Sequence, residues 1–210
     1  MVVVGAARPD RLGGWFLGTT AQRVLRGAAV PVLVIRRPLH RPLERVLLTS
    51  DLSELSAAVH EEGLATAAEV FGEPADMRSL LVLSVPLSPS VLSPEALEYA
   101  ALEELETFLR ARHRRPRAVE PVVRTGAPAD QIVAEAQEWD ADLLVVGTHA
   151  RGWAARLALG SVAEAALRDA PCNVLAVPPR ALALEQHPAA GHAAAEKPVN
   201  AAARAEAMAV

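Results

Sequence analysis

Short apolar runs alternate with amphipathic stretches over most of the chain. Runs typical of buried strands occupy residues 45–49, 80–85, 119–124, 143–146 and 174–177. Strands that are apolar throughout and alternate with helices are typical of a parallel sheet covered on both faces. The pattern therefore predicts an α/β fold, a doubly wound, Rossmann-like parallel sheet of five strands.

Capping residues mark where helices begin between these strands. Asp51 and Ser53 follow the first run and can cap a helix that continues to Phe71, and Ser93 with Pro94 is typical of a second helix start. We expect right-handed crossovers, and a strand order of 3-2-1-4-5 would make the winding reverse between the first and fourth strands. Such sheets bind ligands at that point, beyond the carboxyl ends of the strands.

The chain contains an internal repeat. Residues 3–35 align without a gap on residues 145–177, and each copy is expected to form a strand, a glycine-bearing loop, a helix and a second strand. Equivalent pairs in this register include Gly5 and Gly147, Gly18 and Gly160, and Thr19 and Ser161. Only the second copy is preceded by enough sequence to complete a domain.

The repeat divides the chain into four predicted segments. Residues 1–38 are expected to be the remnant of a first domain, residues 39–43 a linker and residues 44–180 a complete domain. Residues 181–210 form an alanine-rich tail that we expect to be disordered, because prolines interrupt its helical pattern and it has few large apolar side chains.

Composition and charge narrow the classes of function. The 210 residues carry a formal net charge of −4, so no overall positive field attracts nucleic acid or anionic lipid. No apolar stretch approaches the roughly 18 residues of a membrane span, and no basic region precedes the first apolar run, as it would in a signal peptide. The lone Cys172 suits a reducing compartment, no metal-ligand spacing is present, and we expect a cytoplasmic protein.

The loop after the fourth strand has the composition of an anion site. Gly147 ends the strand, and Gly160 and Ser161 stand just before a predicted helix that begins at Val162. The N–H groups and partial positive charge of a helix start, together with a hydroxyl, suit phosphate. The alternative is structural: Gly147 ends a strand and Ser161 caps a helix.

These residues carry a resemblance to a known family. Residues 142–152, 159–164 and 170–175 closely resemble the universal stress protein (UspA-like) family, whose nucleotide-binding members share a glycine, two residues, a glycine, nine residues, then glycine and serine or threonine. Gly147, Gly160 and Ser161 match this spacing, whereas Ala150 replaces the second glycine. The resemblance covers about residues 44–180, and with the repeat it identifies the chain as a tandem form with a truncated first domain.

The resemblance implies ATP, with Mg²⁺, between the first and fourth strands. Ser50 and Asp51 would meet the adenosine, Val85 the adenine and Gly147 the ribose. The remaining implied site residues are Thr148 and Ala150 of the loop, and Gly160, Ser161 and Val162 at the phosphates. If the second glycine position requires a positive φ, alanine there costs about 1–2 kcal/mol, so we expect weakened binding.

The alternative function is a nucleotide-independent, stress-responsive scaffold that acts through dimerisation. In this family the final strands of two domains pair, which implies that residues 32–35 pair with residues 174–177 and that a homodimer uses final-strand pairing. The edge of the strand at residues 2–4 is expected to be open and to favour association. No serine–histidine–aspartate set is evident, so no catalytic residue is assigned and ATP hydrolysis is expected to be slow at most.

Overall fold

The computed structural model describes residues 1–6, 19–39, 42–84, 93–112, 119–148 and 159–178. The strands are β1 (Val2–Gly5), β2 (Val32–Ile35), β3 (Arg45–Ser50), β4 (Asp76–Leu83), β5 (Glu120–Thr125), β6 (Leu143–Gly147) and β7 (Asn173–Val177). The helices are α1 (Thr19–Gly27), α2 (Glu54–Phe71), α3 (Pro94–Arg112), α4 (Pro128–Glu138) and α5 (Ser161–Asp169). The predicted Val85, Ala150 and alanine-rich tail lie outside the described residues.

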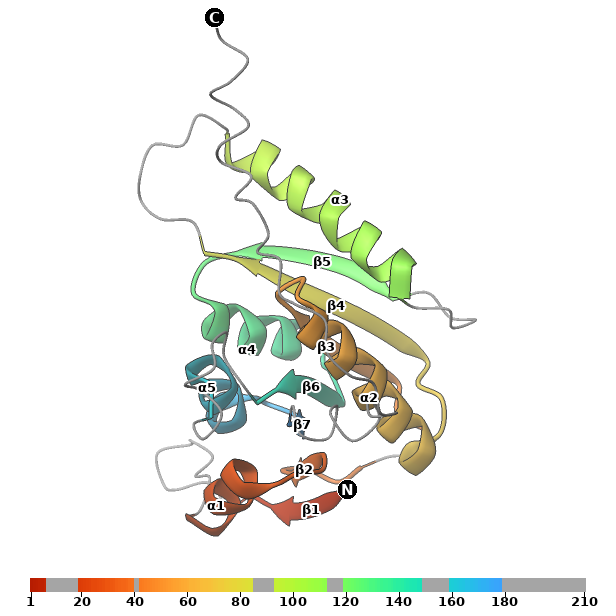
Figure 1. Cartoon of the computed structure of the whole chain (residues 1–210), viewed down its shortest axis with the longest axis vertical. Coiled ribbons are helices and arrows are strands. Elements are labelled where there is room, and N and C mark those ends of the chain that lie inside the picture. The colour runs from red at the N-terminus through yellow and green to blue at the C-terminus, as the bar shows by residue number, and fades with distance from the viewer. Residues whose placement is uncertain (7–18, 40–41, 85–92, 113–118, 149–158, 179–210) are drawn as a thin grey trace, which may run out of the picture.

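One seven-stranded sheet contains every described strand, in the order β1-β2-β7-β6-β3-β4-β5 (Figure 1). Neighbouring strands are parallel except β2 and β7, which are antiparallel. The predicted α/β class with a largely parallel sheet is confirmed. Five of the strands, β7, β6, β3, β4 and β5, come from residues 44–180, and β1 and β2 of the N-terminal copy extend the same hydrogen-bonded ladder to seven.

The final strands of the two copies pair within the chain. Val34 lies opposite Val174 and Val32 opposite Ala176 in the β2–β7 pair. The other edge of β7 is taken by β6, and the other edge of β2 by β1. The predicted homodimer through final-strand pairing therefore finds no open edge on β2 or β7. The outer strands of the sheet are β1 and β5.

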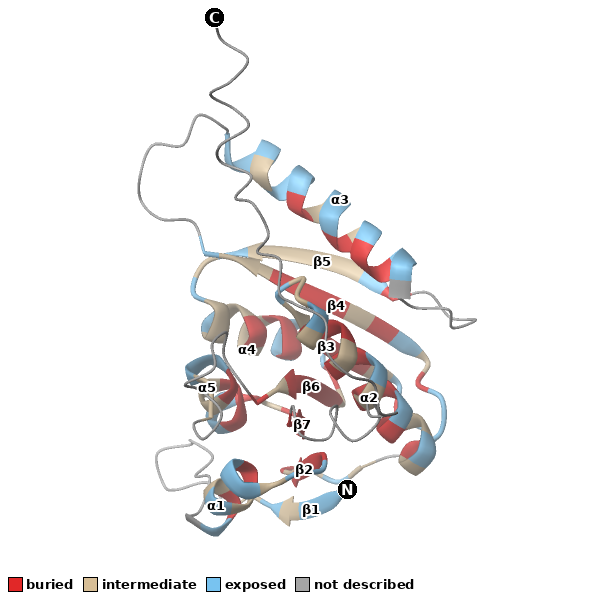
Figure 2. Ribbon diagram, in the orientation of Figure 1, coloured by how far each residue is buried: buried red, intermediate tan, exposed pale blue. Residues whose placement is uncertain are grey.

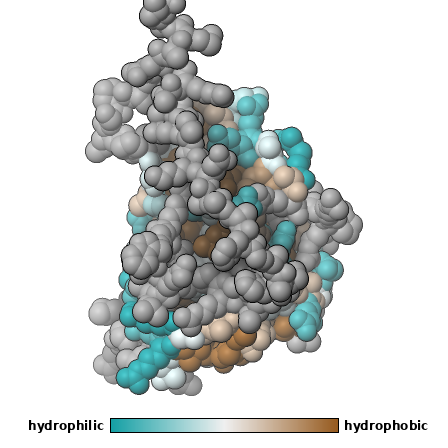
Figure 3. All heavy atoms as spheres, viewed as in Figure 1, coloured by the Kyte–Doolittle hydropathy of each residue, from teal (hydrophilic) through white to brown (hydrophobic). Residues whose placement is uncertain are grey.

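Two clusters of buried apolar side chains cover the faces of the sheet. The buried residues of the central strands are red in Figure 2. Alternating residues of β3 divide between the two clusters, since Val46 and Leu48 face the cluster of α2 and α3 while Leu47 faces that of α1, α4 and α5. Burial on both faces explains the nearly continuous apolar runs of the central strands. At β1 the cover is incomplete, and apolar atoms reach the surface near β1 and β2 at the lower end of Figure 3.

The helices begin at or within one residue of the positions that the capping residues predict. Ser53 is the N-cap of α2, and its hydroxyl accepts a hydrogen bond from the Ser56 N–H. Helix α5 begins at Ser161, one residue before the predicted start, with Gly160 as its N-cap. Strand β4 begins at Asp76, before the predicted residue 80. No helix among the described residues is long and apolar enough to cross a membrane.

Candidate functional site

The carboxyl ends of β3 and β6 meet at one edge of the sheet. These neighbouring parallel strands pair from Val46 and Leu143 onward, so Ser50 and Gly147 end their strands at the same level. The fold therefore brings the predicted residues Ser50 and Asp51 together with Gly147 and Thr148. This is the point at which the chain winds in opposite directions on the two sides of the sheet.

The first turn of α5 is attached to the same edge. The Gly160 N–H donates to the Thr148 carbonyl oxygen at 2.9 Å, and the Thr148 N–H donates to the Val177 carbonyl oxygen at 3.1 Å. No side chain caps the helix at Gly160, and Ser161 and Val162 are exposed. The leading N–H groups of a helix have no partner inside it, and they carry its partial positive charge. This turn can accept an anion beside the ends of β3 and β6.

The turn after β3 is held by its own side chains. Ser50 Oγ accepts a hydrogen bond from the Leu52 N–H at 3.1 Å and lies 3.3 Å from Ser56 Oγ. Asp51 Oδ1 accepts from the Ser53 N–H at 3.1 Å, while the Asp51 side chain is exposed. Leu52 has a φ of 61°, a conformation that these bonds stabilise. Ser50 therefore shapes the turn, and Asp51 presents a carboxylate at the surface.

A buried histidine supports this turn from behind. His60 is fully buried, and its Nε2 lies 3.0 Å from the Thr49 carbonyl oxygen, so the ring donates to the end of β3. Its ring also meets Phe108 edge-on, with 5.8 Å between centroids. Sequence reasoning did not assign His60 to this region, because its ring contact with Phe108 joins two helices that are far apart along the chain. Its position on the core side of α2 was the available signal.

Gly147 has a packing reason to be glycine. An ideal Cβ there would lie 3.1 Å from Val59 Cγ2 of α2, closer than side chains comfortably approach. Among the described glycines, positive φ occurs at Gly72 and Gly126, so backbone conformation is not the reason at Gly147. Close packing of α2 on β6 accounts for this glycine without any ligand.

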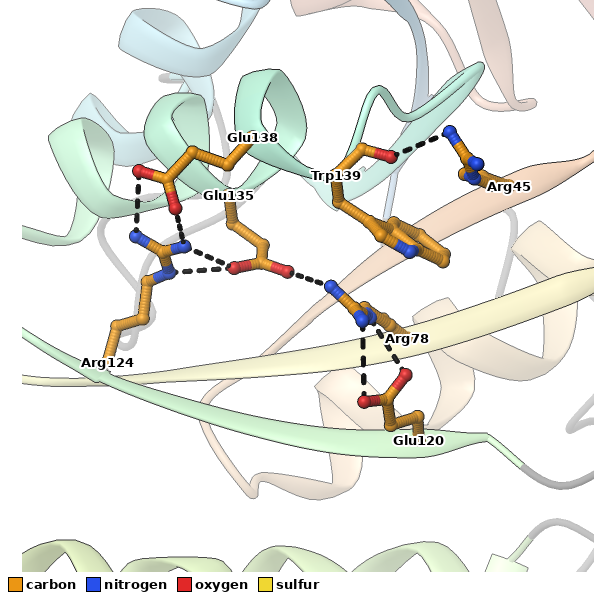
Figure 4. A network of polar contacts seen from close by, with 7 residues as sticks. All are labelled: Arg45, Arg78, Glu120, Arg124, Glu135, Glu138 and Trp139. Atoms are coloured by element: carbon orange, nitrogen blue, oxygen red, sulfur yellow. Dashed lines mark hydrogen bonds and ion pairs between the residues drawn. The ribbon is translucent and has the colours of Figure 1, made fainter.

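A second polar cluster lies away from this edge, between α4 and the strands β4 and β5 (Figure 4). Glu135 is buried, and its carboxylate accepts from Arg78 at 2.9 Å and from Arg124 at 2.7 Å. Partial burial lowers the pKa of Arg78, but its bonds to Glu120 and Glu135 outweigh that effect and raise it. The guanidinium of Arg78 also lies 4.6 Å from the centre of the Trp139 ring. Every charge is paired, so the cluster fastens α4 to the sheet.

A cavity of about 240 Å³ lies at the other end of the strands, where β6 and β7 begin. Its lining residues are Arg37, Pro38, Leu39, Asp140, Asp142 and Asn173. Asp142 Oδ2 accepts hydrogen bonds from the N–H groups of Glu44 and Arg45, at the start of β3. Asn173 Oδ1 accepts hydrogen bonds from the N–H groups of Arg36 and Arg37, after β2. Asp142 thus joins the starts of β3 and β6, and Asn173 joins β7 to the segment that follows β2. No group of three or more metal-ligating side chains occurs in the part of the chain that the structure describes.

Comparison with known proteins places the chain in a family. A sequence profile of the universal stress protein family matches residues 1–36 and, separately, residues 42–178. A universal stress protein of Mycobacterium tuberculosis is 31% identical over 184 residues, covering 83% of this chain and 60% of that protein. Another, from Methanocaldococcus jannaschii, is 27% identical over 143 residues, covering 64% of this chain and 81% of the relative. The chain thus spans about three fifths of the mycobacterial relative.

Solved structures share the fold. A protein from Pseudomonas aeruginosa, described as a universal stress protein, superposes with a TM-score of 0.66 at 20% identity, covering 86% of this chain and 63% of that one. One from Archaeoglobus fulgidus has a TM-score of 0.61 at 21% identity, covering 84% of this chain and 61% of its own length. A universal stress protein solved in complex with cAMP is also similar, with a TM-score of 0.45 at 29% identity, covering 65% of this chain and 97% of that protein. Because the family profile matches nearly all of the first 178 residues, this chain belongs to the universal stress protein family.

Proposed function

We propose that this universal stress protein binds ATP, accompanied by Mg²⁺, at the carboxyl ends of β3 and β6 and acts as a regulatory protein of the stress response. The observation that carries the proposal is the hydrogen bond from the Gly160 N–H to the Thr148 carbonyl oxygen. It fixes the first turn of α5, which no side chain caps, at the strand end that lies beside Asp51. A helix start in that position suits a phosphate chain.

The proposed contacts divide between the two strand ends. The N–H groups of Ser161 and Val162 and the Ser161 hydroxyl donate to phosphate oxygens. The exposed carboxylate of Asp51 accepts from the adenosine. Gly147 and Thr148 lie between these groups, and Val85 and Ala150 are proposed to complete the adenine and phosphate sides. Mg²⁺ would be held chiefly by the nucleotide phosphates.

The proposed role is to bind ATP, with ATP hydrolysis slow at most. The proposed location of the protein is the cytoplasm. Residues 1–38 act in this proposal as the remnant of a first domain of a tandem protein. Ser50, whose hydroxyl is engaged by Leu52 and Ser56, contributes by shaping the turn that presents Asp51.

Calorimetric titration of the full chain with ATP and MgCl₂ tests the proposal. We expect saturable heat, with tighter binding for Ala150→Gly, since glycine tolerates positive φ and leaves room for phosphate. Binding should be lost in Gly160→Trp, whose side chain would crowd the start of α5, whereas Gly18→Trp, at the position of the other copy that aligns with Gly160, should bind like the native chain. Absence of heat for both the native chain and Ala150→Gly would contradict the proposal.

A nucleotide-independent scaffold is the second candidate, and the exposure of β1 favours it. Val3 of this outer strand is 57% exposed, which is unusual for a valine in a strand. If the protein acts as such a scaffold, its homodimer would form by pairing at the open edge of β1, because both edges of β2 and β7 are occupied.

A further inference from the structure

The cavity where β6 and β7 begin lies apart from the proposed ATP site, which is at the carboxyl ends of the same parallel strands. Its volume is about 240 Å³, and Pro38 and Leu39 give it an apolar wall. One water needs roughly 10–15 Å³, and pockets for drug-sized ligands have roughly 300–1,000 Å³. The cavity therefore has room for one small organic molecule.

Asn173 brings unused hydrogen-bond donors to this cavity. The residue is 1% exposed, and its Oδ1 accepts from the Arg36 N–H at 2.8 Å and from the Arg37 N–H at 3.2 Å. Because these bonds turn Oδ1 toward the chain after β2, the NH₂ group is the end of the amide left for the cavity. Among the described residues, Nδ2 has no hydrogen-bond partner. Polar groups of residues this buried are normally paired.

The strand that Asn173 begins does not explain why the residue is asparagine. An aspartate would accept the same two backbone bonds, as Asp142 Oδ2 does for Glu44 and Arg45. In the repeat register, Asn173 corresponds to Pro31, which has no side-chain donor. What asparagine adds is the NH₂ group, and in the described part of the chain that group binds nothing.

Two carboxylates supply the opposite chemistry in the same cavity. Asp142 lines it, with Oδ2 engaged by backbone N–H groups and with no partner for Oδ1 among the described residues. Asp140 lines it as well, and its side chain is 75% exposed. The cations beside Asp140 are loosely placed, with Arg37 Nη1 at 3.5 Å and Arg45 Nη1 at 3.9 Å. Both carboxylates can therefore accept further hydrogen bonds.

The carboxylate of Asp140 stands against the local preference of the chain. Asp140 follows the end of α4 with a φ of 50°, a conformation that favours glycine. A negative charge at this end of a helix also opposes the helix dipole. The turn is closed by the backbone, since the Ala141 N–H donates to the Ala136 carbonyl oxygen at 2.9 Å. The turn itself thus has no need of an acidic side chain.

The charges around the cavity select the kind of ligand. Two anionic side chains, Asp140 and Asp142, are balanced by Arg37 and by Arg45 beside Asp140. A simple anion would meet two carboxylates, and a simple cation would leave the Asn173 NH₂ group unpaired. A zwitterion satisfies both kinds of group, because it carries an acceptor and a charged donor a short distance apart.

We propose that this cavity binds a free α-amino acid with a small apolar side chain. Its carboxylate accepts hydrogen bonds from Asn173 Nδ2 and the Arg37 guanidinium. Its ammonium group donates to Asp142 Oδ1 and to the Asp140 carboxylate. Its side chain lies against the apolar wall of the cavity. This site does not depend on the binding of ATP.

Nuclear magnetic resonance on the isotope-labelled full chain tests the proposal. The probes are L-valine and two analogues: isobutylamine, which lacks the carboxylate, and isovalerate, which lacks the amino group. We expect L-valine to shift the side-chain amide signals of Asn173 saturably, and each analogue to bind about tenfold more weakly or worse, since it leaves charged groups unpaired. ATP with MgCl₂ should not displace L-valine.

Two variants separate the two halves of the site, and the backbone amide of Asp142 reports binding in both. Asn173→Asp keeps the acceptor for the backbone N–H groups and replaces the NH₂ group by a carboxylate oxygen, so L-valine affinity should fall about tenfold or more. Asp140→Asn removes an exposed charge and suits the positive φ, so the fold is kept while affinity falls about threefold. Asp130→Asn, in the first turn of α4 and outside the cavity, makes the same change of charge and should bind like the native chain.

The proposal is wrong if L-valine gives no saturable shift at Asn173 up to its solubility limit. It is equally wrong if isobutylamine or isovalerate binds as tightly as L-valine, because the cavity would then recognise a single charge. Displacement of L-valine by ATP would also overturn it, since both would then share one site. Thermal midpoints check that the variants fold; if Asn173→Asp does not, unchanged affinity in Asp140→Asn still contradicts the proposal.

Discussion

The strand–helix–strand units at the two ends of the chain have nearly the same apolar pattern and different surroundings. Their helices are equally buried, with Leu25 of α1 2% exposed and the equivalent Leu167 of α5 0% exposed. Their outer strands differ, since Val3 of β1 is 57% exposed and Val145 of β6 is fully buried. The local pattern places each helix on its own strands, but the burial of the outer strand depends on a neighbour that only β6 has.

The same difference separates the two helix starts as candidate ligand sites. Helix α5 begins beside the end of β3 and its exposed Asp51, whereas no described strand lies beyond β1 to bring a carboxylate toward α1. A helix start becomes a plausible nucleotide site only when a second strand end supplies the other half of the contacts.

The largest expected difference comes from a charge at the equivalent valines. Val145→Asp would bury a carboxylate among apolar side chains and should cost more than about 4 kcal/mol, enough to unfold many domains. Val3→Asp places the same charge at an exposed edge and should change stability by about 0.5 kcal/mol or less. Urea denaturation of both variants measures the contrast, and equal losses would contradict the comparison.

Gly63→Ala tests the close approach of α2 to β6. Alanine is favoured over glycine in a helix by about 1 kcal/mol, but its Cβ would meet the rigid Val145 side chain at 2.4 Å. Displacement of packed groups by an inserted methyl costs about 1–3 kcal/mol, so we expect a net loss of about 1–2 kcal/mol. Gly5→Ala, with open space around it, should lose no stability. A stabilised Gly63→Ala variant would show that the helix moves away easily.

The sequence predicted those parts of the fold that depend on local pattern. Ser53 and Pro94 placed helix starts, and the apolar run at residues 32–35 has the bounds of β2. The pairing of β2 with β7 could not be read from local pattern and was expected only from the family resemblance, because it joins segments that are far apart along the chain. The start of β4 was missed because Arg78 interrupts the apolar run, and its charge is compensated by Glu120 and Glu135 from distant segments.

The candidate site was predicted in outline, and its details were not. The strand ends carrying Ser50 and Gly147 do lie together, since adjacent parallel strands end at the same edge. The packing of Gly147 against Val59 and the bond from His60 to β3 depend on how α2 lies across the sheet. Spacing along the sequence holds no information about that crossing.

Ser161→Asp sharpens the comparison of the two helix starts. A carboxylate in the first turn favours the helix dipole, so the variant should gain about 0.3–1 kcal/mol of stability. The same charge repels phosphate, and ATP affinity measured by calorimetry should fall about tenfold. Thr19→Asp at the start of α1 should give a similar gain in stability with no loss of affinity. Equal loss of affinity in both variants would place the nucleotide elsewhere.

Cys172 and its equivalent Val30 differ in burial, and this difference should appear as reactivity. Cys172 is fully buried, whereas Val30 is 37% exposed. Burial raises the pKa of the Cys172 thiol from 9.0 to about 11, with smaller opposing effects of Arg37 and Arg36. At neutral pH the thiolate should therefore be about a hundredfold scarcer than in an ordinary cysteine, and alkylation correspondingly slow. Val30→Cys in a Cys172→Val background should react like an exposed thiol.

The same shift predicts a pH dependence of stability. Between about pH 9 and pH 11 the unfolded chain has released the thiol proton that the folded chain still holds, so the contribution of Cys172 is complete below about pH 9 and is lost as the pH rises toward 11. The loss should reach about 1.4 kcal/mol at pH 10 relative to Cys172→Val, which has no thiol to titrate. Denaturation midpoints of both proteins from pH 8 to pH 11 measure it. Parallel curves would mean that the thiol ionises in the folded chain as easily as in the unfolded one, and hence that the strand entry before β7 opens to water.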